Sequence, residues 1–146
     1  MQARTLNDQG QGQVASYALI FQPGDEVIGE LTRFAKEHEL DASDFTALGA
    51  FSEAMLGFFD IGRRDYERIP VDEQSEVLTL VGNITLDDGR PKVHAHVVLG
   101  LVDGSTRGGH LLEGYVRPTL ELVLTESPVQ LRRKFDPETG LALIQP

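Results

Sequence analysis

Two Asp-Gly pairs divide the middle of this 146-residue chain into segments of strand-like sequence. Asp88-Gly89 and Asp103-Gly104 are typical of the tight turns that join antiparallel strands. The segments before and after the first turn, 77–86 and 92–101, are rich in the branched apolar residues that favour strands. Hairpins of this kind predict a largely antiparallel sheet, and they fix which residues of neighbouring strands lie opposite each other.

Further strands are predicted on both sides of this region from apolar and alternating sequence. They are expected at residues 14–21, 45–59, 66–71, 108–117 and 119–124. Gly49 and Gly57 interrupt the second of these segments, which indicates either two short strands or one bent strand. A short terminal element is expected at 128–134.

One long helix is predicted, directly after the first strand. Pro23-Gly24 ends that strand, and Asp25 is the expected N-cap of the helix. Five apolar residues then follow the spacing of a single helix face: Val27, Ile28, Leu31, Phe34 and Ala35. We therefore predict an α+β fold, α/β sandwich-like, in which one main helix packs on a mainly antiparallel β-sheet.

The length and composition fit a single globular domain. We expect this domain at residues 14–135, between a flexible N-terminal tail at 1–13 and a surface tail at 136–146. The sequence contains no cysteine, which excludes disulfides and thiolate metal sites. It shows no secretory signal pattern and no apolar run of about 18 residues, so we expect a cytoplasmic protein without a membrane span.

The charge of the chain bears on its partners. Thirteen Lys and Arg residues stand against 23 Asp and Glu residues, which gives a net charge of −10. Affinity for DNA comes mostly from cationic side chains that neutralise phosphates, so this balance disfavours DNA binding. The basic cluster Arg132-Arg133-Lys134 is expected to be a solvated face.

Three of the four histidines lie close together in the sequence, at His94, His96 and His110. The first two belong to one predicted strand, so their side chains point to the same face, about 6.6 Å apart at Cα. If residues 102–104 form a three-residue loop, His96 lies opposite His110. Three imidazoles on one face are a donor set that Zn²⁺ accepts together with a water molecule.

Two alternatives remain open for this cluster. A slip of one residue at Gly108-Gly109 would move His110 to the opposite face. The histidines would then be ordinary half-buried side chains that hydrogen-bond to backbone carbonyls. The fourth, His38, follows one turn after Phe34 near the helix C-terminus, where an imidazolium complements the helix dipole, and we interpret it as structural.

Other polar residues are candidates for the same site. If Asp88-Gly89 is a two-residue loop, Asn83 lies beside His94, where it orients an imidazole or hydrogen-bonds a ligand. Glu113 and Glu53 stand in otherwise apolar strands, which indicates either an ion pair with an arginine or a group poised for proton transfer. Arg117 is one candidate partner, and both carboxylates are candidate catalytic bases.

Several short segments of the chain form a recognisable combination. They are Tyr17-Ala18-Leu19, Pro23-Gly24-Asp25, Leu48-Gly49-Ala50-Phe51-Ser52-Glu53-Ala54, Leu56-Gly57-Phe58-Phe59-Asp60, Leu80-Val81-Gly82-Asn83-Ile84, Val93-His94-Ala95-His96-Val97 and Gly108-Gly109-His110-Leu111-Leu112. Together they are similar to the plants-and-prokaryotes-conserved (PPC) domain family, over about residues 14–125.

The resemblance implies a mainly antiparallel sheet, a homotrimer and a role in assembly or partner binding. In plants the domain follows AT-hooks, and stand-alone prokaryotic members are often labelled as DNA-binding proteins by that association. The histidine positions of the family fall on His94, His96 and His110. We therefore expect a stand-alone PPC-domain protein, a homotrimer with a three-histidine site for zinc or a small ligand. The alternatives are a DNA-binding regulator and a zinc-dependent enzyme of unknown substrate, with Glu113 or Glu53 as its base.

Overall fold

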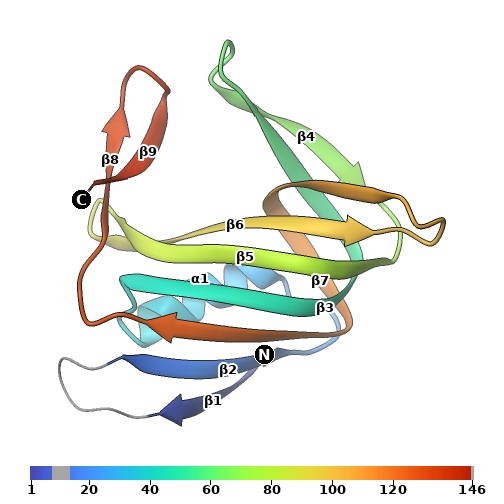
Figure 1. Ribbon diagram of the computed structural model, residues 1–146, viewed down its shortest axis with the longest axis horizontal. Helices are drawn as coiled ribbons and strands as arrows, with labels where there is room; N and C mark the ends of the chain where they lie inside the picture. Colours follow the sequence, from blue (N-terminus) through green and yellow to red (C-terminus); the bar gives the residue numbers. More distant parts are fainter. Residues whose placement is uncertain (8–13, 146) are drawn as a thin grey trace.

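A computed structural model of the protein describes residues 1–7 and 14–145, and these form one nine-stranded sheet and one helix. The helix is α1 (Val27–Glu37). The strands are β1 (Gln2–Asn7), β2 (Ala15–Phe21), β3 (Ala42–Asp60), β4 (Asp65–Val71), β5 (Ser75–Asp87), β6 (Arg90–Gly100), β7 (Thr106–Glu126), β8 (Arg132–Asp136) and β9 (Leu141–Gln145). The protein is therefore mostly sheet, and the predicted class holds with the helix as its minor part (Figure 1).

The long strands β3 and β7 organise the sheet. They pair with each other along most of their length, β5 pairs with β3, and β6 pairs with both β5 and β7. The four strands β3, β5, β6 and β7 thus close a circuit of antiparallel pairings. Only the short contact between β5 and β8 is parallel among the described strands. Strand β3 is one strand rather than two. Its pairing with β7 shifts register at several points, and irregularities of this kind bend a strand without ending it.

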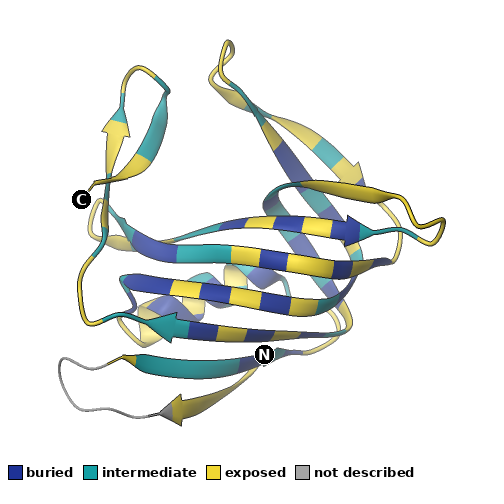
Figure 2. Cartoon of the chain, in the orientation of Figure 1, coloured by how far each residue is buried: buried dark blue, intermediate teal, exposed yellow. Residues whose placement is uncertain are grey.

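Helix α1 covers one face of the sheet (Figure 1). It buries Val27, Leu31, Phe34 and Ala35, four of the five residues of the predicted apolar face. On the strands, buried residues alternate with exposed ones, so the core lies between α1 and the sheet (Figure 2). The opposite face of β3, β5 and β6 carries no helix among the described residues. The β8–β9 hairpin lies over one end of it, at Asn83 and Thr85, and the rest, here called the uncovered face, carries the candidate site.

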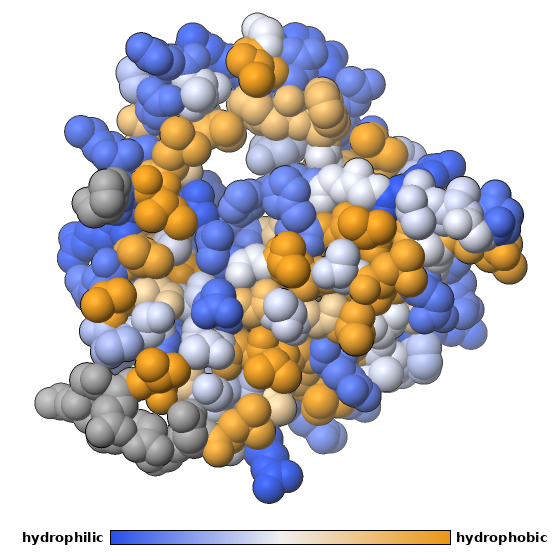
Figure 3. All heavy atoms as spheres, in the orientation of Figure 1, coloured by the Kyte–Doolittle hydropathy of each residue, from blue (hydrophilic) through white to orange (hydrophobic). Residues whose placement is uncertain are grey.

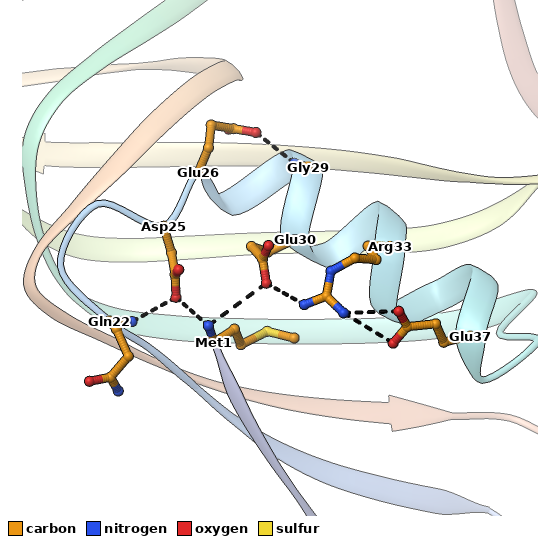
Figure 4. A network of polar contacts seen from close by, with 8 residues as sticks. All are labelled: Met1, Gln22, Asp25, Glu26, Gly29, Glu30, Arg33 and Glu37. Atoms are coloured by element: carbon orange, nitrogen blue, oxygen red, sulfur yellow. Dashed lines mark hydrogen bonds and ion pairs between the residues drawn. The ribbon is translucent and has the colours of Figure 1, made fainter.

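The N-cap prediction at Asp25 is wrong by one residue. Glu26 is the N-cap, and its carboxylate accepts a hydrogen bond from the backbone N–H of Ile28 at 3.0 Å. It also accepts one from the N–H of Gly29 at 2.6 Å, which Figure 4 shows. Asp25 turns the other way: it accepts from the Gln22 N–H at 2.8 Å and forms an ion pair with the N-terminal amine of Met1 at 2.6 Å. The preceding turn therefore engages the shorter carboxylate before it can cap the helix.

The expected N-terminal tail is ordered in its first part. Residues Gln2–Asn7 form β1 and pair antiparallel with β2. The segment lacks an apolar pattern because it is an edge strand held by backbone hydrogen bonds, which need no particular side chains. Residues 8–13 of that predicted tail lie outside the described residues.

The expected C-terminal tail is also a strand. Leu141–Gln145 forms β9 and returns along β8, so the predicted domain end at residue 135 falls inside a hairpin. A tight turn produces the hairpin: Gly140 adopts a φ of 77°, and its N–H donates to the Asp136 carbonyl at 2.8 Å. Among the described residues, no helix combines the length and the apolar character that a membrane crossing requires.

Candidate metal centre

The two predicted hairpin turns place the histidines. Around the second turn, the Leu101 N–H donates to the Ser105 carbonyl and the Gly104 N–H donates to the Leu101 carbonyl, both at 2.9 Å. This three-residue loop sets His96 directly opposite His110, as predicted. The first turn is a two-residue loop and sets Asn83 opposite His94, also as predicted.

The three imidazoles form one cluster on the uncovered face of the sheet. A ligating nitrogen from each of His94, His96 and His110 lies within 4.8 Å of those of the other two. The rings of His94 and His110 are stacked, with centroids 5.0 Å apart, and the ring of His96 meets both at a steep angle. Nitrogens bound to one tetrahedral Zn²⁺ stand about 3.4 Å apart at the usual Zn–N distance of about 2.1 Å. Small side-chain rotations bring three such nitrogens into range, so the donor set fits the ion.

A glycine lets β7 approach β3 closely enough to hold His110 in place. A Cβ atom at Gly109 would lie 2.9 Å from the carbonyl oxygen of Gly57 in β3, which is too close for any other residue without a backbone shift. Gly57 is also the residue that pairs with His110. The glycine next to His110 therefore sets how closely this histidine lies to β3.

The surroundings favour the neutral form of two imidazoles. Burial lowers the pKa of His110 to about 4, with smaller contributions from the other two histidines, Lys92 and Arg133. Burial, followed by the charge of Arg133, also lowers the pKa of His94. Metal ions bind the neutral imidazole, so no proton has to be displaced from these two side chains near pH 7.

Tyr66 of β4 lies next to the cluster. Its hydroxyl is 3.5 Å from Nδ1 of His110, and the two rings lie with centroids 4.8 Å apart. Burial raises the pKa of the Tyr66 hydroxyl, so the phenol stays protonated and able to donate. No feature of the sequence around Tyr66 indicated this position, because the contact joins β4 and β7, which do not pair.

Arg133 is a site residue that the sequence did not indicate. The basic cluster was expected to be a solvated face, but only Arg132 and Lys134 are exposed, whereas Arg133 is half-buried. Its guanidinium donates to Thr85 Oγ1 at 2.7 Å, to the Ala142 carbonyl at 2.9 Å and to Asn83 Oδ1 at 2.7 Å. The prediction of a solvated face is thus wrong for the middle residue. The available signal was the strand period of two, which turns alternate side chains to opposite faces.

Asn83 reaches the site through this arginine. Its side-chain oxygen accepts from Arg133, and the residue lines a shallow hollow together with His94 and His96. Its predicted roles were to orient an imidazole or to hydrogen-bond a ligand; the structure shows it orienting Arg133.

Two hairpins form an arch beside the cluster. The tip of the β3–β4 hairpin and the tip of the β8–β9 hairpin meet where Arg64 donates to the carbonyl of Glu138 at 3.3 Å. Beneath them lies a pocket of about 190 Å³, lined by residues of β4, β6, β7, β8 and β9 that include His94 and His110. Figure 3 shows the molecule hollowed between these two projections.

The two candidate catalytic carboxylates are placed elsewhere. Glu113 forms an ion pair with Arg68 of β4 at 2.6 Å, so its arginine partner is Arg68 rather than Arg117. Glu53 is exposed and pairs through the backbone with Tyr115. Neither carboxylate is among the described residues that line the pocket or the hollow at the histidines.

The class of protein is defined by two features. One is the circuit of strands β3, β5, β6 and β7 with a helix on one face, and the other is the three-histidine cluster on the face away from that helix. The Plants and Prokaryotes Conserved (PCC) domain, abbreviated PPC above, matches residues 9–128. The chain therefore belongs to this family, as the resemblance in its sequence predicts.

Solved structures agree with this assignment. A plant- and prokaryote-conserved protein from Pyrococcus horikoshii is 31% identical with a TM-score of 0.86, over 96% of this chain and 98% of its own. A metal-containing protein from Archaeoglobus fulgidus is 31% identical with a TM-score of 0.83, over 90% of this chain and 93% of its own. A protein from Bacteroides thetaiotaomicron, provisionally described as DNA-binding, is 25% identical with a TM-score of 0.87, over 98% of this chain and 96% of its own.

Curated relatives show the domain as part of a longer chain. The bifunctional protein GlmU of one Synechococcus strain is 34% identical over 132 residues, and that of a second strain is 33% identical. The match covers 88% of this chain and 20% of each relative, so the chain spans about a fifth of their length.

Proposed function

We propose that this protein binds a divalent metal ion, zinc, on His94, His96 and His110. The observation that carries the proposal is the convergence of three imidazole nitrogens within 4.8 Å of one another. The metal-containing relative from Archaeoglobus fulgidus supports it. Nitrogen donors without carboxylates favour Zn²⁺ and similar transition metals over Mg²⁺ and Ca²⁺, which prefer oxygen.

Three protein ligands leave a coordination position open. A zinc ion with three protein ligands acts as a Lewis acid or binds a further ligand at its fourth position. His94 and His110 line the pocket beneath the arch, so the open side of the site faces a space where a small molecule fits. The phenol of Tyr66 and the guanidinium of Arg133 face the same space.

Elemental analysis of the purified protein tests the metal site. We expect close to one zinc ion per chain in the wild type, and its loss in a His94→Ala, His96→Ala double variant. His38→Ala is the matched control: His38 packs against Phe34 at a ring distance of 4.1 Å, away from the cluster. Equal metal content in the wild type and the double variant would end the proposal.

We also propose that the protein is a homotrimer whose contacts use the uncovered sheet face. Large apolar side chains are exposed there: Leu48 is 63% exposed, Val123 51% and Val81 47%. Figure 3 shows apolar surface spread over this side of the sheet. Exposed apolar patches of this kind mark interaction surfaces. The assembly supports a partner-binding role for the domain.

DNA binding is the second candidate function, and it rests on the description of the Bacteroides thetaiotaomicron relative. The net charge of −10 opposes it, because an acidic chain is repelled by the phosphate backbone. A gel shift with duplex DNA at low salt is the test. Binding that weakens steeply as salt is added would favour this function over a role confined to the metal site.

A zinc-dependent enzyme is the third candidate. It needs a proton acceptor near the metal-bound water, and the described residues that line the pocket include no carboxylate. Tyr66 is a protonated donor there, and Glu113 and Glu53 lie elsewhere. Turnover screening of metal-loaded protein separates this function from simple binding.

A further inference from the structure

The pocket beneath the arch has a polar end and an apolar end. Tyr66, Arg133 and the two histidines His94 and His110 form the polar end, and Leu141 and Leu143 of β9 belong to the apolar wall. Its volume of about 190 Å³ is small. The space suits a small molecule rather than a drug-sized one.

Arg133 has hydrogen-bonding capacity left for a ligand. A guanidinium carries five N–H donors, of which three reach Thr85, Asn83 and Ala142. One N–H on each terminal nitrogen remains without a protein acceptor among the described residues. The three bonds hold the planar group in a fixed orientation, so a ligand would find it already positioned.

The charge at this point is not matched by a carboxylate in contact. Among the described residues, Arg133 forms no ion pair, while the neighbouring Lys92 is paired with Asp87 at 2.9 Å. The charge of Asp87 also acts on Arg133, though without a hydrogen bond. The guanidinium is half-buried and has no bonded anion. Because the chain as a whole has a net charge of −10, this positive charge is a local feature of the pocket and not part of a basic surface.

We infer that the pocket binds a small carboxylate with a short aliphatic body, held between the metal ion and Arg133. The inference rests on the proposed metal site. One carboxylate oxygen would serve as the further ligand of the ion, and the other would accept from the guanidinium, for which carboxylates are matched partners. The apolar wall accounts for the aliphatic body. Arg133 lies in β8, beyond residues 9–128 that match the family.

A cobalt-substituted protein provides the test, because the visible absorption of bound Co²⁺ responds to a change of ligand. Isobutyrate is titrated into the cobalt-loaded wild type, with Arg133→Gln as the test variant and Arg132→Gln as the matched control. Arg132 is exposed, and among the described residues its side chain donates to Gln130. Inorganic phosphate is titrated in parallel as an oxyanion without an aliphatic body. Circular dichroism and cobalt content establish that each variant is folded and loaded.

We expect isobutyrate to change the cobalt spectrum of the wild type and of Arg132→Gln at the same concentration. Arg133→Gln should need an isobutyrate concentration at least about ten times higher, because it loses one charge-assisted hydrogen bond to the ligand. If Arg133→Gln does not fold, Arg133→Lys is the test variant instead. Lysine keeps the positive charge but lacks the planar guanidinium, so this variant should bind isobutyrate more weakly than the wild type.

Three results would overturn the inference. One is a spectrum that isobutyrate leaves unchanged in fully loaded wild type, and another is equal affinity in the wild type and the folded Arg133 variants. The third is tighter binding of phosphate than of isobutyrate, which would contradict the assignment to a carboxylate. A wild type that takes up no cobalt and no zinc would instead overturn the proposed metal site, so the two failures are distinguishable.

Discussion

Burial controls the protonation of the imidazole cluster. His94 and His110 are half-buried, and both have a pKa below the usual value because their charged forms lose hydration. Arg133 adds a positive charge nearby, which lowers both further. The same environment that prepares these side chains to bind a metal therefore links the stability of the metal-free protein to pH.

His110 gives the clearest pH prediction. Its pKa falls from 6.5 to about 4 on folding, so between these values the unfolded chain binds more protons than the folded one. Its contribution to stability is complete above pH 6.5 and is lost as the pH falls towards 4. After allowance for its partial exposure to solvent, we expect the loss to be about 1–2 kcal/mol.

Denaturant unfolding of the metal-free protein at about pH 7 and about pH 4.5 measures this difference. The His110→Gln variant cannot titrate at this position. Its free energy of unfolding should fall less between the two pH values than that of the wild type. An equal fall in both proteins would contradict the assignment.

At the scale of single elements, the start of α1 depends on Glu26. This side chain accepts from two N–H groups of the first helical turn and also from the Gly114 N–H at 3.3 Å. It thereby ties the helix to β7, the strand that carries His110. The carboxylate also complements the positive end of the helix dipole.

We expect Glu26→Ala to lower the free energy of unfolding by about 1 kcal/mol, the usual cost of a lost N-cap. Glu37→Ala is the control, because it removes an exposed ion pair with Arg33, worth about 0.3–0.5 kcal/mol. Both are measured by denaturant unfolding. A smaller effect at Glu26 than at Glu37 would show that the capping contact contributes little.

The β8–β9 hairpin acts as a second structural element of the site. It supplies Arg133 and apolar residues of the pocket, and its tip closes the arch through Arg64. Two hydrogen bonds from Arg133, to Thr85 and Asn83, join the hairpin to β5. A third, to the Ala142 carbonyl, joins β8 to β9 within the hairpin. If the pocket binds its ligand through Arg133 as proposed, recognition depends on a segment outside the closed circuit of strands.

At the scale of the whole molecule, one sheet face is covered by α1 and the other carries both the histidines and exposed apolar side chains. Val81 pairs with His96, so the apolar surface reaches the edge of the metal site. If this face forms the trimer contacts, assembly would enclose the cluster further.

Light scattering tests the assembly: we expect a mass of three times 16.1 kDa for the wild type. Leu48→Asp places a charge in the apolar face and should reduce the mass towards that of one chain, because an unpaired charge is costly to bury. Val102→Asp is the control, since Val102 is 95% exposed in a turn. A wild type of single-chain mass, or a Leu48→Asp variant that remains trimeric, would contradict the proposed interface.

The sequence alone determined the local parts of this protein. The apolar face of α1, the two Asp-Gly turns and the resulting opposition of His96 to His110 follow from short-range periodicity and loop length. These features depend on residues close together in the chain, so a single sequence contains their signal. The family resemblance likewise rests on short segments.

Only the tertiary structure decided which distant segments complete the site. Tyr66 and Arg133 come from β4 and β8, which approach the histidines through the curvature of the sheet and the arch of two hairpins. Glu113, three residues after His110, is instead held by Arg68 of β4. The physical reason is that a side chain joins a site through packing between elements that do not pair, and no periodicity within either segment encodes that contact.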